Sequence, residues 1–332
     1  MRIGVIGVGR IGPFHARVLK SNPNVLSVVV ADLDTDRAQT IARELEVEVA
    51  SSVDELIGGV DAVLIAASTN AHATLIKRAV DAGKPTFCEK PIALDLESTR
   101  DVVRHVRESG VPVQLGFQRR FDAGYCAARE MVTSGKLGTV YVIRVAGHDP
   151  APPHEAYIPQ SGGLFRDFSI HDFDVLRWMT GCEVEEVYAD GGVRGFPVFA
   201  KYGDVDTAVA TLRLHDGPFT VLTVTRHDPL GYDVRTEVFG SQDSVSVGLG
   251  PKTPMRSVEP GVPPPAGPAW KDFLERFESA YAAEFTAFVA VARGEAPSPC
   301  TAADGVAALR VAEAADRSLH EHRPVQLAEI PG

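Results

Sequence analysis

Residues 1–12 read MRIGVIGVGRIG, a β-branched run that leads into a glycine-rich turn. Glycine serves a different purpose at each of three positions. Gly7 permits a tight turn, Gly9 lets the backbone approach a pyrophosphate, and Gly12 lets a helix pack close to a sheet. Asp32 follows twenty residues after Gly12, at the end of a second β-branched run. Together these features predict a strand–turn–helix unit whose helix N-terminus binds a dinucleotide phosphate.

Asp32 also indicates which dinucleotide binds. A carboxylate at the end of the second strand accepts hydrogen bonds from the ribose hydroxyls and repels a 2′-phosphate, which favours NAD over NADP. We interpret Arg37, five residues further on, as a solvated helix residue. The alternative is a glycine turn that binds no ligand.

The first 115 residues alternate between short apolar runs and helical patterns. Such alternation predicts right-handed crossovers and a doubly wound parallel sheet with helices on both faces, an α/β fold. Asp95 is expected to cap the last of these helices. The predicted strands are 2–6, 26–31, 62–66, 85–88 and 112–115, and the predicted helices are 12–21, 35–45, 71–82 and 94–109.

The pattern changes after residue 116. An amphipathic helix over 170–180 is followed by alternating segments that predict a large, mostly antiparallel open sheet in an α+β domain. We expect an NAD-binding domain over 1–118 and an α+β domain over 119–332, with the last helix and strand packing back near the first domain. Residues 251–270 hold seven prolines and are expected to be irregular. Predicted strands are 184–189, 208–214, 220–225, 234–239 and 324–327, and predicted helices are 280–292 and 302–320.

Composition restricts the class of partner. The 332 residues carry a net charge of −11, so a nucleic-acid or anionic-membrane partner is not expected and a small molecule is. No apolar run is long enough to span a membrane, and the N-terminal stretch lacks a signal cleavage site. The widely spaced cysteines give no metal-binding or disulfide pattern, which suits a reduced cytoplasm; they are Cys88, Cys126, Cys182 and Cys300.

Two short motifs carry groups capable of chemistry. Glu89-Lys90-Pro91 follows the predicted strand 85–88, at the edge where open α/β sheets bind ligands, and Lys90 could there stabilise negative charge on a substrate oxygen. Asp167 and His171 lie four residues apart in a mainly apolar helical segment, so the carboxylate could orient the imidazole as a general base. Their alternatives are a surface lysine in a turn and an acid–histidine pair that decorates a helix.

Together with the glycine-rich turn at 7–12 and Asp32, these motifs make the chain resemble the glucose-fructose oxidoreductase, inositol dehydrogenase and rhizopine-catabolism (Gfo/Idh/MocA) family, nearly from end to end. The further motifs that carry the resemblance, particularly to inositol-oxidising members, are GFQRRFD (116–122), DPAPP (149–153), SGGLFRD (161–167) continuing to DFD (172–174), and GYD (231–233) before EVFG (237–240). The resemblance implies a Rossmann domain and a C-terminal α+β domain, over 119–332, that serves substrate binding and oligomerisation. It also implies a homodimer or homotetramer and NAD-dependent oxidation of a ring hydroxyl of a cyclic polyol, with myo-inositol the first expectation.

The resemblance also assigns residues to roles, with no metal in the reaction. The catalytic set is Lys90, Asp167 and His171. The cofactor-binding set is Gly7, Gly9, Arg10, Ile11, Gly12, Asp32, Ser68, Asn70, His72, Glu89 and Lys90. The substrate-binding set is Gln118, Arg119, Asp149, Asp167, His171 and Tyr232.

Three stretches depart from the inositol-type pattern. Gln118 stands where Met or Asn is usual, residues 225–227 read Thr-Arg-His in place of Asn-Ser-Arg, and 157–160 read Tyr-Ile-Pro-Gln in place of Tyr-Ile-Lys-Val. Two alternatives therefore stay open. The substrate could be another inositol isomer, a sugar or an aminosugar, or the chain could be a non-catalytic regulator that senses NAD or a sugar.

Overall fold

The computed structural model describes residues 1–331, and the chain divides into two compact units. Unit 1 comprises residues 1–121 and 279–307, and unit 2 comprises residues 122–278 with the described residues from 308 onward. The boundary between residues 278 and 279 falls close to Phe277, where helix α9 (Phe273–Ala292) is kinked. The boundary between residues 307 and 308 falls inside helix α10 (Ala302–Glu321). The boundary at residue 118 stays a prediction.

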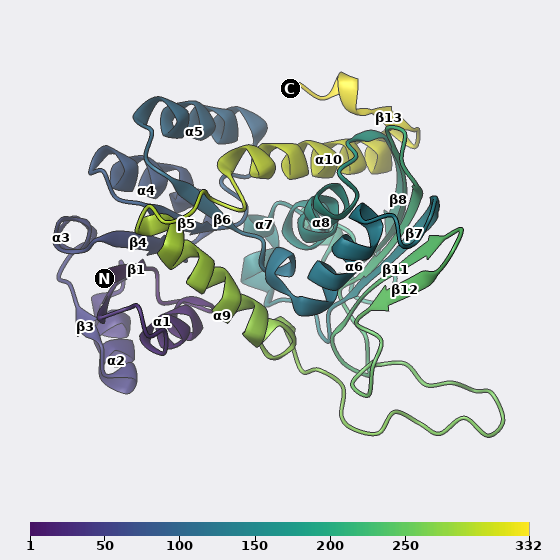
Figure 1. Ribbon diagram of the computed structural model, residues 1–332, viewed down its shortest axis with the longest axis horizontal. Coiled ribbons are helices and arrows are strands. Elements are labelled where there is room, and N and C mark those ends of the chain that lie inside the picture. The colour runs from purple at the N-terminus through teal and green to yellow at the C-terminus, as the bar shows by residue number, and fades with distance from the viewer. Residues whose placement is uncertain (332) are drawn as a thin grey trace. The chain divides into compact units, whose positions relative to one another are not determined.

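Unit 1 contains a six-stranded parallel sheet in the order β3-β2-β1-β4-β5-β6 (Figure 1). This is the doubly wound sheet expected from the sequence. The strands are β1 (Arg2–Ile6), β2 (Ser27–Ala31), β3 (Glu48–Val49), β4 (Ala62–Ile65), β5 (Thr86–Glu89) and β6 (Val113–Gly116). The helices between them are α1 (Gly12–Lys20), α2 (Thr35–Leu45), α3 (Val53–Gly59), α4 (Thr69–Asp81) and α5 (Leu96–Ser109).

The strand order determines where this unit binds a ligand. The chain runs from β1 outward to β2 and β3, then returns to β4 on the other side of β1. The loops after β1 and β4 therefore diverge at a topological switch point, where doubly wound sheets bind ligands. Both strands are wholly buried at their centres, since Val5 and Leu64 have no exposed surface. Asp95 caps α5 by accepting from the Ser98 N–H, as predicted.

Unit 2 contains a seven-stranded sheet in the order β12-β11-β7-β10-β9-β8-β13. All its pairs are antiparallel except β7 with β10, which are parallel. The prediction of a mostly antiparallel sheet is confirmed. The predicted strands begin and end within two residues of the observed ones, except that β8 ends three residues later than predicted. The strands are β7 (Val140–His148), β8 (Val184–Gly192), β9 (Thr207–Leu214), β10 (Phe219–Thr225), β11 (Asp233–Gly240), β12 (Ser244–Val247) and β13 (Val325–Gln326).

Helices α6 (Ala123–Thr133) and α8 (Ile170–Thr180) pack against each other beside this sheet (Figure 1). A π-helical turn, η3 (Phe165–Ser169), runs directly into α8. The shorter segments are η2 (Glu155–Tyr157), α7 (Ile158–Ser161), η4 (Ala200–Tyr202) and η5 (Leu327–Glu329), with η1 (Gln118–Phe121) in unit 1. Residues 251–270 form a long irregular loop, as predicted. Among the described helices, none combines the length and apolarity needed to cross a membrane.

Candidate active site

The glycine-rich loop after β1 has the shape that a dinucleotide pyrophosphate requires. Gly7 has φ +94°, and a Cβ there would lie 2.6 Å from backbone atoms of Ala67. A Cβ on Gly12 would lie 2.0 Å from the Gly7 carbonyl oxygen, whereas one on Gly9 would meet nothing within 4 Å. The loop is thus packed tightly on its inner side and open at Gly9. No side chain caps α1 at Ile11, so the first N–H groups of this helix are available to an anion.

Asp32 follows β2 and anchors this loop. Its Oδ2 accepts from the Val8 N–H at 2.7 Å, and its Oδ1 accepts from the Asp34 N–H at 2.9 Å and from Arg37 Nη2 at 2.6 Å. Partial burial acts to raise the pKa of Asp32, but these hydrogen bonds and the Arg37 charge outweigh it and lower the pKa. The carboxylate is therefore ionised and ready to accept from a ribose. The interpretation of Arg37 as merely solvated is incomplete, since it pairs with Asp32.

Removing the carboxylate should change which dinucleotide the protein prefers. In Asp32→Ala the ribose hydroxyls lose their acceptor, and Arg37 is released to meet a 2′-phosphate. We expect the ratio of kcat/KM for NAD to that for NADP to fall by about tenfold or more, equivalent to about 1.4 kcal/mol. Arg37→Ala is the control and should keep its preference for NAD. An unchanged ratio in Asp32→Ala would remove Asp32 from cofactor selection.

The loop after β4 supplies three of the predicted cofactor residues. Ser68 and Asn70 are exposed at the start of α4, where Ser68 Oγ donates to Asn70 Oδ1. His72 is buried, with Nδ1 2.7 Å from the Pro91 carbonyl oxygen and Nε2 2.9 Å from that of Ala67. Burial lowers the pKa of His72. The ring therefore links the loop after β4 to the turn after β5.

Glu89 ends β5 and Lys90 begins the turn, joined to Pro91 by a cis peptide bond. Glu89 Oε1 lies 2.6 Å from Nε2 of His15, a wholly buried residue of α1. The pair ties the glycine-rich helix to the strand that presents Lys90. His15 was missed in the sequence because nothing local marks its partner, 74 residues away. Burial raises the pKa of the neighbouring Cys88 thiol, which fits an inert core residue.

Gln118 and Arg119 lie in η1, directly after β6. Both side chains are almost completely buried, with 3% and 2% of their surface exposed. Arg120 beside them donates to the Pro299 carbonyl oxygen and pairs with Asp304 at 2.9 Å. A short turn at the carboxyl end of a parallel strand is a usual place for ligand-binding groups.

The second group of predicted residues lies in unit 2. Asp167 occupies the π-helical turn and His171 the second position of α8, so the two share a continuous helical segment that is not a regular α-helix. Tyr157 donates from its hydroxyl to Asp167 Oδ1 at 2.8 Å. Arg226 Nη1 lies 2.8 Å from the other oxygen, Oδ2. Both oxygens of the predicted catalytic carboxylate are therefore fixed by named partners.

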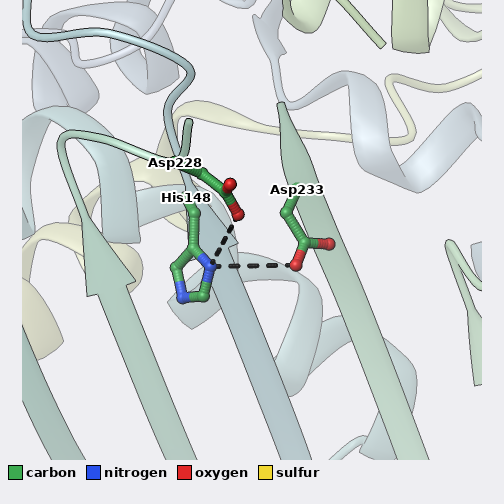
Figure 2. Close-up of side chains that lie close together, drawn as sticks. All are labelled: His148, Asp228 and Asp233. Carbon is green, nitrogen blue, oxygen red and sulfur yellow. Dashed lines mark ion pairs between the residues drawn. The ribbon is translucent and has the colours of Figure 1, made fainter. Parts of the chain in front are cut away.

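The predicted substrate residues Asp149 and Tyr232 lie at one edge of the seven-stranded sheet. Asp149 follows β7 and Tyr232 precedes β11, and these antiparallel strands pair His148 with Asp233. Figure 2 shows His148, Asp228 and Asp233 converging at this edge, with His148 Nδ1 3.8 Å from Asp228 Oδ2 and 3.7 Å from Asp233 Oδ2. This cluster fixes the strand ends that carry Asp149 and Tyr232.

The same three side chains are close enough to suggest a metal site. However, both Asp233 oxygens already accept from Arg235, at 2.8 and 2.9 Å. Burial lowers the pKa of His148, while Asp233 and Asp228 act in the opposite direction. A carboxylate engaged by a guanidinium is a poor metal ligand, so we interpret the cluster as an ion-pair network.

The switch-point loop, the ionised Asp32 and the lysine turn are the features of a dinucleotide-dependent oxidoreductase. The model of the oxidoreductase family with an NAD-binding Rossmann fold matches residues 1–117, and that of the Gfo/Idh/MocA C-terminal domain matches residues 125–246. The chain belongs to the Gfo/Idh/MocA family. It is an NAD-dependent oxidoreductase that acts on CH–OH groups.

Relatives of this chain match it over its whole length. A myo-inositol dehydrogenase of Streptomyces leeuwenhoekii is 41% identical over 96% of this chain and 97% of its own, and a myo-inositol 2-dehydrogenase of Thermotoga maritima is 40% identical over 100% of both. The scyllo-inositol dehydrogenase of Lactobacillus casei, solved with NAD(H) and scyllo-inositol, is 32% identical, with a TM-score of 0.88 over 99% of each chain. The resemblance inferred from the motifs is confirmed.

Proposed function

We propose that this protein oxidises myo-inositol to 2-keto-myo-inositol (scyllo-inosose), with NAD as the acceptor. The observation that carries the proposal is the full-length similarity, at 40 and 41% identity, to two myo-inositol dehydrogenases. It is supported by the polar edge of unit 2, where Asp149 and Asp167 are held beside each other by Arg226. Carboxylates are suited to accept hydrogen bonds from the several hydroxyls of a polyol.

In this mechanism two of the proposed catalytic side chains, His171 and Lys90, act on the hydroxyl that is oxidised, and Asp167 acts through His171. Bound NAD supplies the acceptor for the hydride. His171 removes the hydroxyl proton, while Asp167 orients the imidazole and stabilises its protonated form. Lys90 donates a hydrogen bond to the same oxygen and stabilises the negative charge that develops before the carbonyl forms. Gln118, Arg119, Asp149 and Tyr232 are proposed to bind the remaining hydroxyls.

The test is the rate of NADH formation, followed by absorbance, with purified protein and a panel of substrates. The panel holds myo-inositol, scyllo-inositol, an aldose and an aminosugar, each with NAD and with NADP. We expect the highest kcat/KM with myo-inositol and NAD. Turnover of only the aldose or aminosugar would contradict the choice of substrate. NAD binding with no turnover of any compound would favour the regulator.

We also propose that the protein acts in the cytoplasm as a homodimer or homotetramer. The seven-stranded sheet supports the proposed oligomer, because one of its faces carries large apolar side chains that are 39 to 58% exposed. The pairing of β8, β9 and β10 places them on the same face; they are Tyr188, Val209, Phe219 and Val221. Exposed apolar patches of this kind on a sheet are typical of subunit interfaces.

A further inference from the structure

Arg226 is a buried cation that directly follows strand β10 of the seven-stranded sheet, and it is not among the site residues expected from the sequence. It follows β10, whose last residue, Thr225, pairs with His148 at the end of the parallel strand β7. The Asp149 N–H donates to the Thr225 carbonyl oxygen at 3.0 Å. Parallel pairing thus brings Asp149 and Arg226 to the same end of adjacent strands, although they are 77 residues apart.

The Arg226 guanidinium bridges two of the predicted site residues. Its Nη1 lies 2.8 Å from Asp167 Oδ2 and 3.4 Å from Asp149 Oδ2, and only 3% of the side chain is exposed. Asp204 is a third carboxylate near this charge, and burial raises its pKa. The Arg226 guanidinium therefore interacts with three acidic side chains. Without the guanidinium between them, the Asp149 and Asp167 carboxylates would repel each other.

The hydrogen bonding of Arg226 is also incomplete. Its Nε and Nη2 atoms are buried and have no hydrogen-bond partner among the described residues. Buried N–H groups without partners are destabilising, so an arginine kept only for stability would be expected to satisfy them. The arrangement instead directs one nitrogen at two carboxylates and leaves the others unused. This favours a role in organising those carboxylates.

We propose that Arg226 is a positioning residue that holds Asp167 as an oriented carboxylate for its action on His171. This inference rests on the proposed function. Tyr157 fixes one oxygen of Asp167 and Arg226 fixes the other, so the carboxylate cannot rotate freely. An oriented, ionised carboxylate sets the imidazole in the productive tautomer and stabilises it as it takes up the proton. Arg226 thus acts on the reaction through Asp167.

The experiment compares Arg226→Met, Arg226→Gln and Arg226→Lys in NAD-dependent oxidation of myo-inositol. We expect kcat to fall about 50-fold or more in the Met and Gln variants, with KM for myo-inositol within about threefold of wild type. Arg226→Lys keeps the charge and should recover kcat to within about tenfold of wild type. The Kd for NADH, from fluorescence titration, should stay within about twofold, because the cofactor residues are in unit 1.

Arg276→Met is the matched control. Arg276 also pairs with a buried carboxylate at 2.8 Å, that of Asp122 at the start of α6, and this pair is remote in sequence from Asp167. The Arg276→Met substitution should lower the melting temperature, while kcat stays within about twofold of the wild-type value. An unchanged kcat in folded Arg226→Met or Arg226→Gln would overturn the proposal, as would a rise in KM alone, which would mean direct contact with the polyol. A wild-type protein inactive with every polyol would instead overturn the proposed function and this inference with it.

Discussion

Replacing Lys90 or His171 with alanine is expected to lower kcat for NAD-dependent polyol oxidation by about 100-fold or more. His171 is the proposed acceptor of the hydroxyl proton, and positioned acid–base groups contribute about 10²–10⁴ to rates. Lys90 is proposed to donate the hydrogen bond that stabilises the developing alkoxide, and its loss should have an effect of similar size. In His171→Ala, NADH binding, measured by fluorescence titration, should stay near the wild-type value. In Lys90→Ala the loss of kcat should exceed any loss of NADH affinity, since Lys90 is also in the expected cofactor-binding set.

Lys84→Ala is a suitable control for Lys90→Ala. Lys84 lies just before β5 and donates to the Val60 carbonyl oxygen, so its loss removes a lysine from the same unit without touching the turn. Its kcat should be unchanged. If Lys90→Ala or His171→Ala retained wild-type turnover, the role given to that residue would be wrong. A double variant that is no slower than either single variant would indicate that the two residues act in one step.

Substituting Gly12 with alanine is expected to abolish measurable NAD binding and to destabilise the protein. The new Cβ would lie 2.0 Å from the Gly7 carbonyl oxygen, a backbone atom that cannot move aside by rotating a side chain. The loop would have to shift, which would displace the N–H groups at the start of α1. Loss of a phosphate site built from several such groups should weaken binding about 100-fold or more.

Two other glycines make this prediction specific. Gly9→Ala meets nothing within 4 Å, so it should leave the melting temperature near wild type and weaken NAD binding only by filling the space over the loop. Gly58→Ala, in helix α3, also meets nothing and should alter neither property. Wild-type NAD binding by Gly12→Ala would show that the glycine-rich loop does not bind the pyrophosphate.

The doubly wound sheet could be predicted because most of its strands and helices are encoded locally. The exceptions are the two-residue strand β3 (Glu48–Val49), whose residues are exposed, and helix α3 (Val53–Gly59), neither of which was predicted. The other strands are apolar runs buried on both faces, as in β4 (Ala62–Ile65), and the other helices have amphipathic patterns and capping residues such as Asp95. Strand β7 was missed, because its run of apolar residues around Val142 shows no clean alternation. Helix α6 was missed because Gly124 in its first turn weakens the helical signal.

The site was predictable only in part, because its side chains are brought together by long-range pairing. The glycine loop and Asp32 have a fixed spacing along the chain, so their relation could be inferred from sequence. The contact of Arg226 with Asp149 depends on the parallel pairing of β7 with β10, which no local pattern indicates. The π-helical turn that carries Asp167 has no propensity signal of its own, so a regular helix was expected there.

The central claim is that this chain transfers hydride from the carbon bearing the 2-hydroxyl of myo-inositol to NAD. It is tested most directly by supplying myo-inositol deuterated at that carbon and analysing both products by mass spectrometry and NMR. We expect one deuterium to appear in the reduced cofactor and the other product to be 2-keto-myo-inositol. Reduced cofactor without deuterium, or a ketone at another ring position, would contradict it.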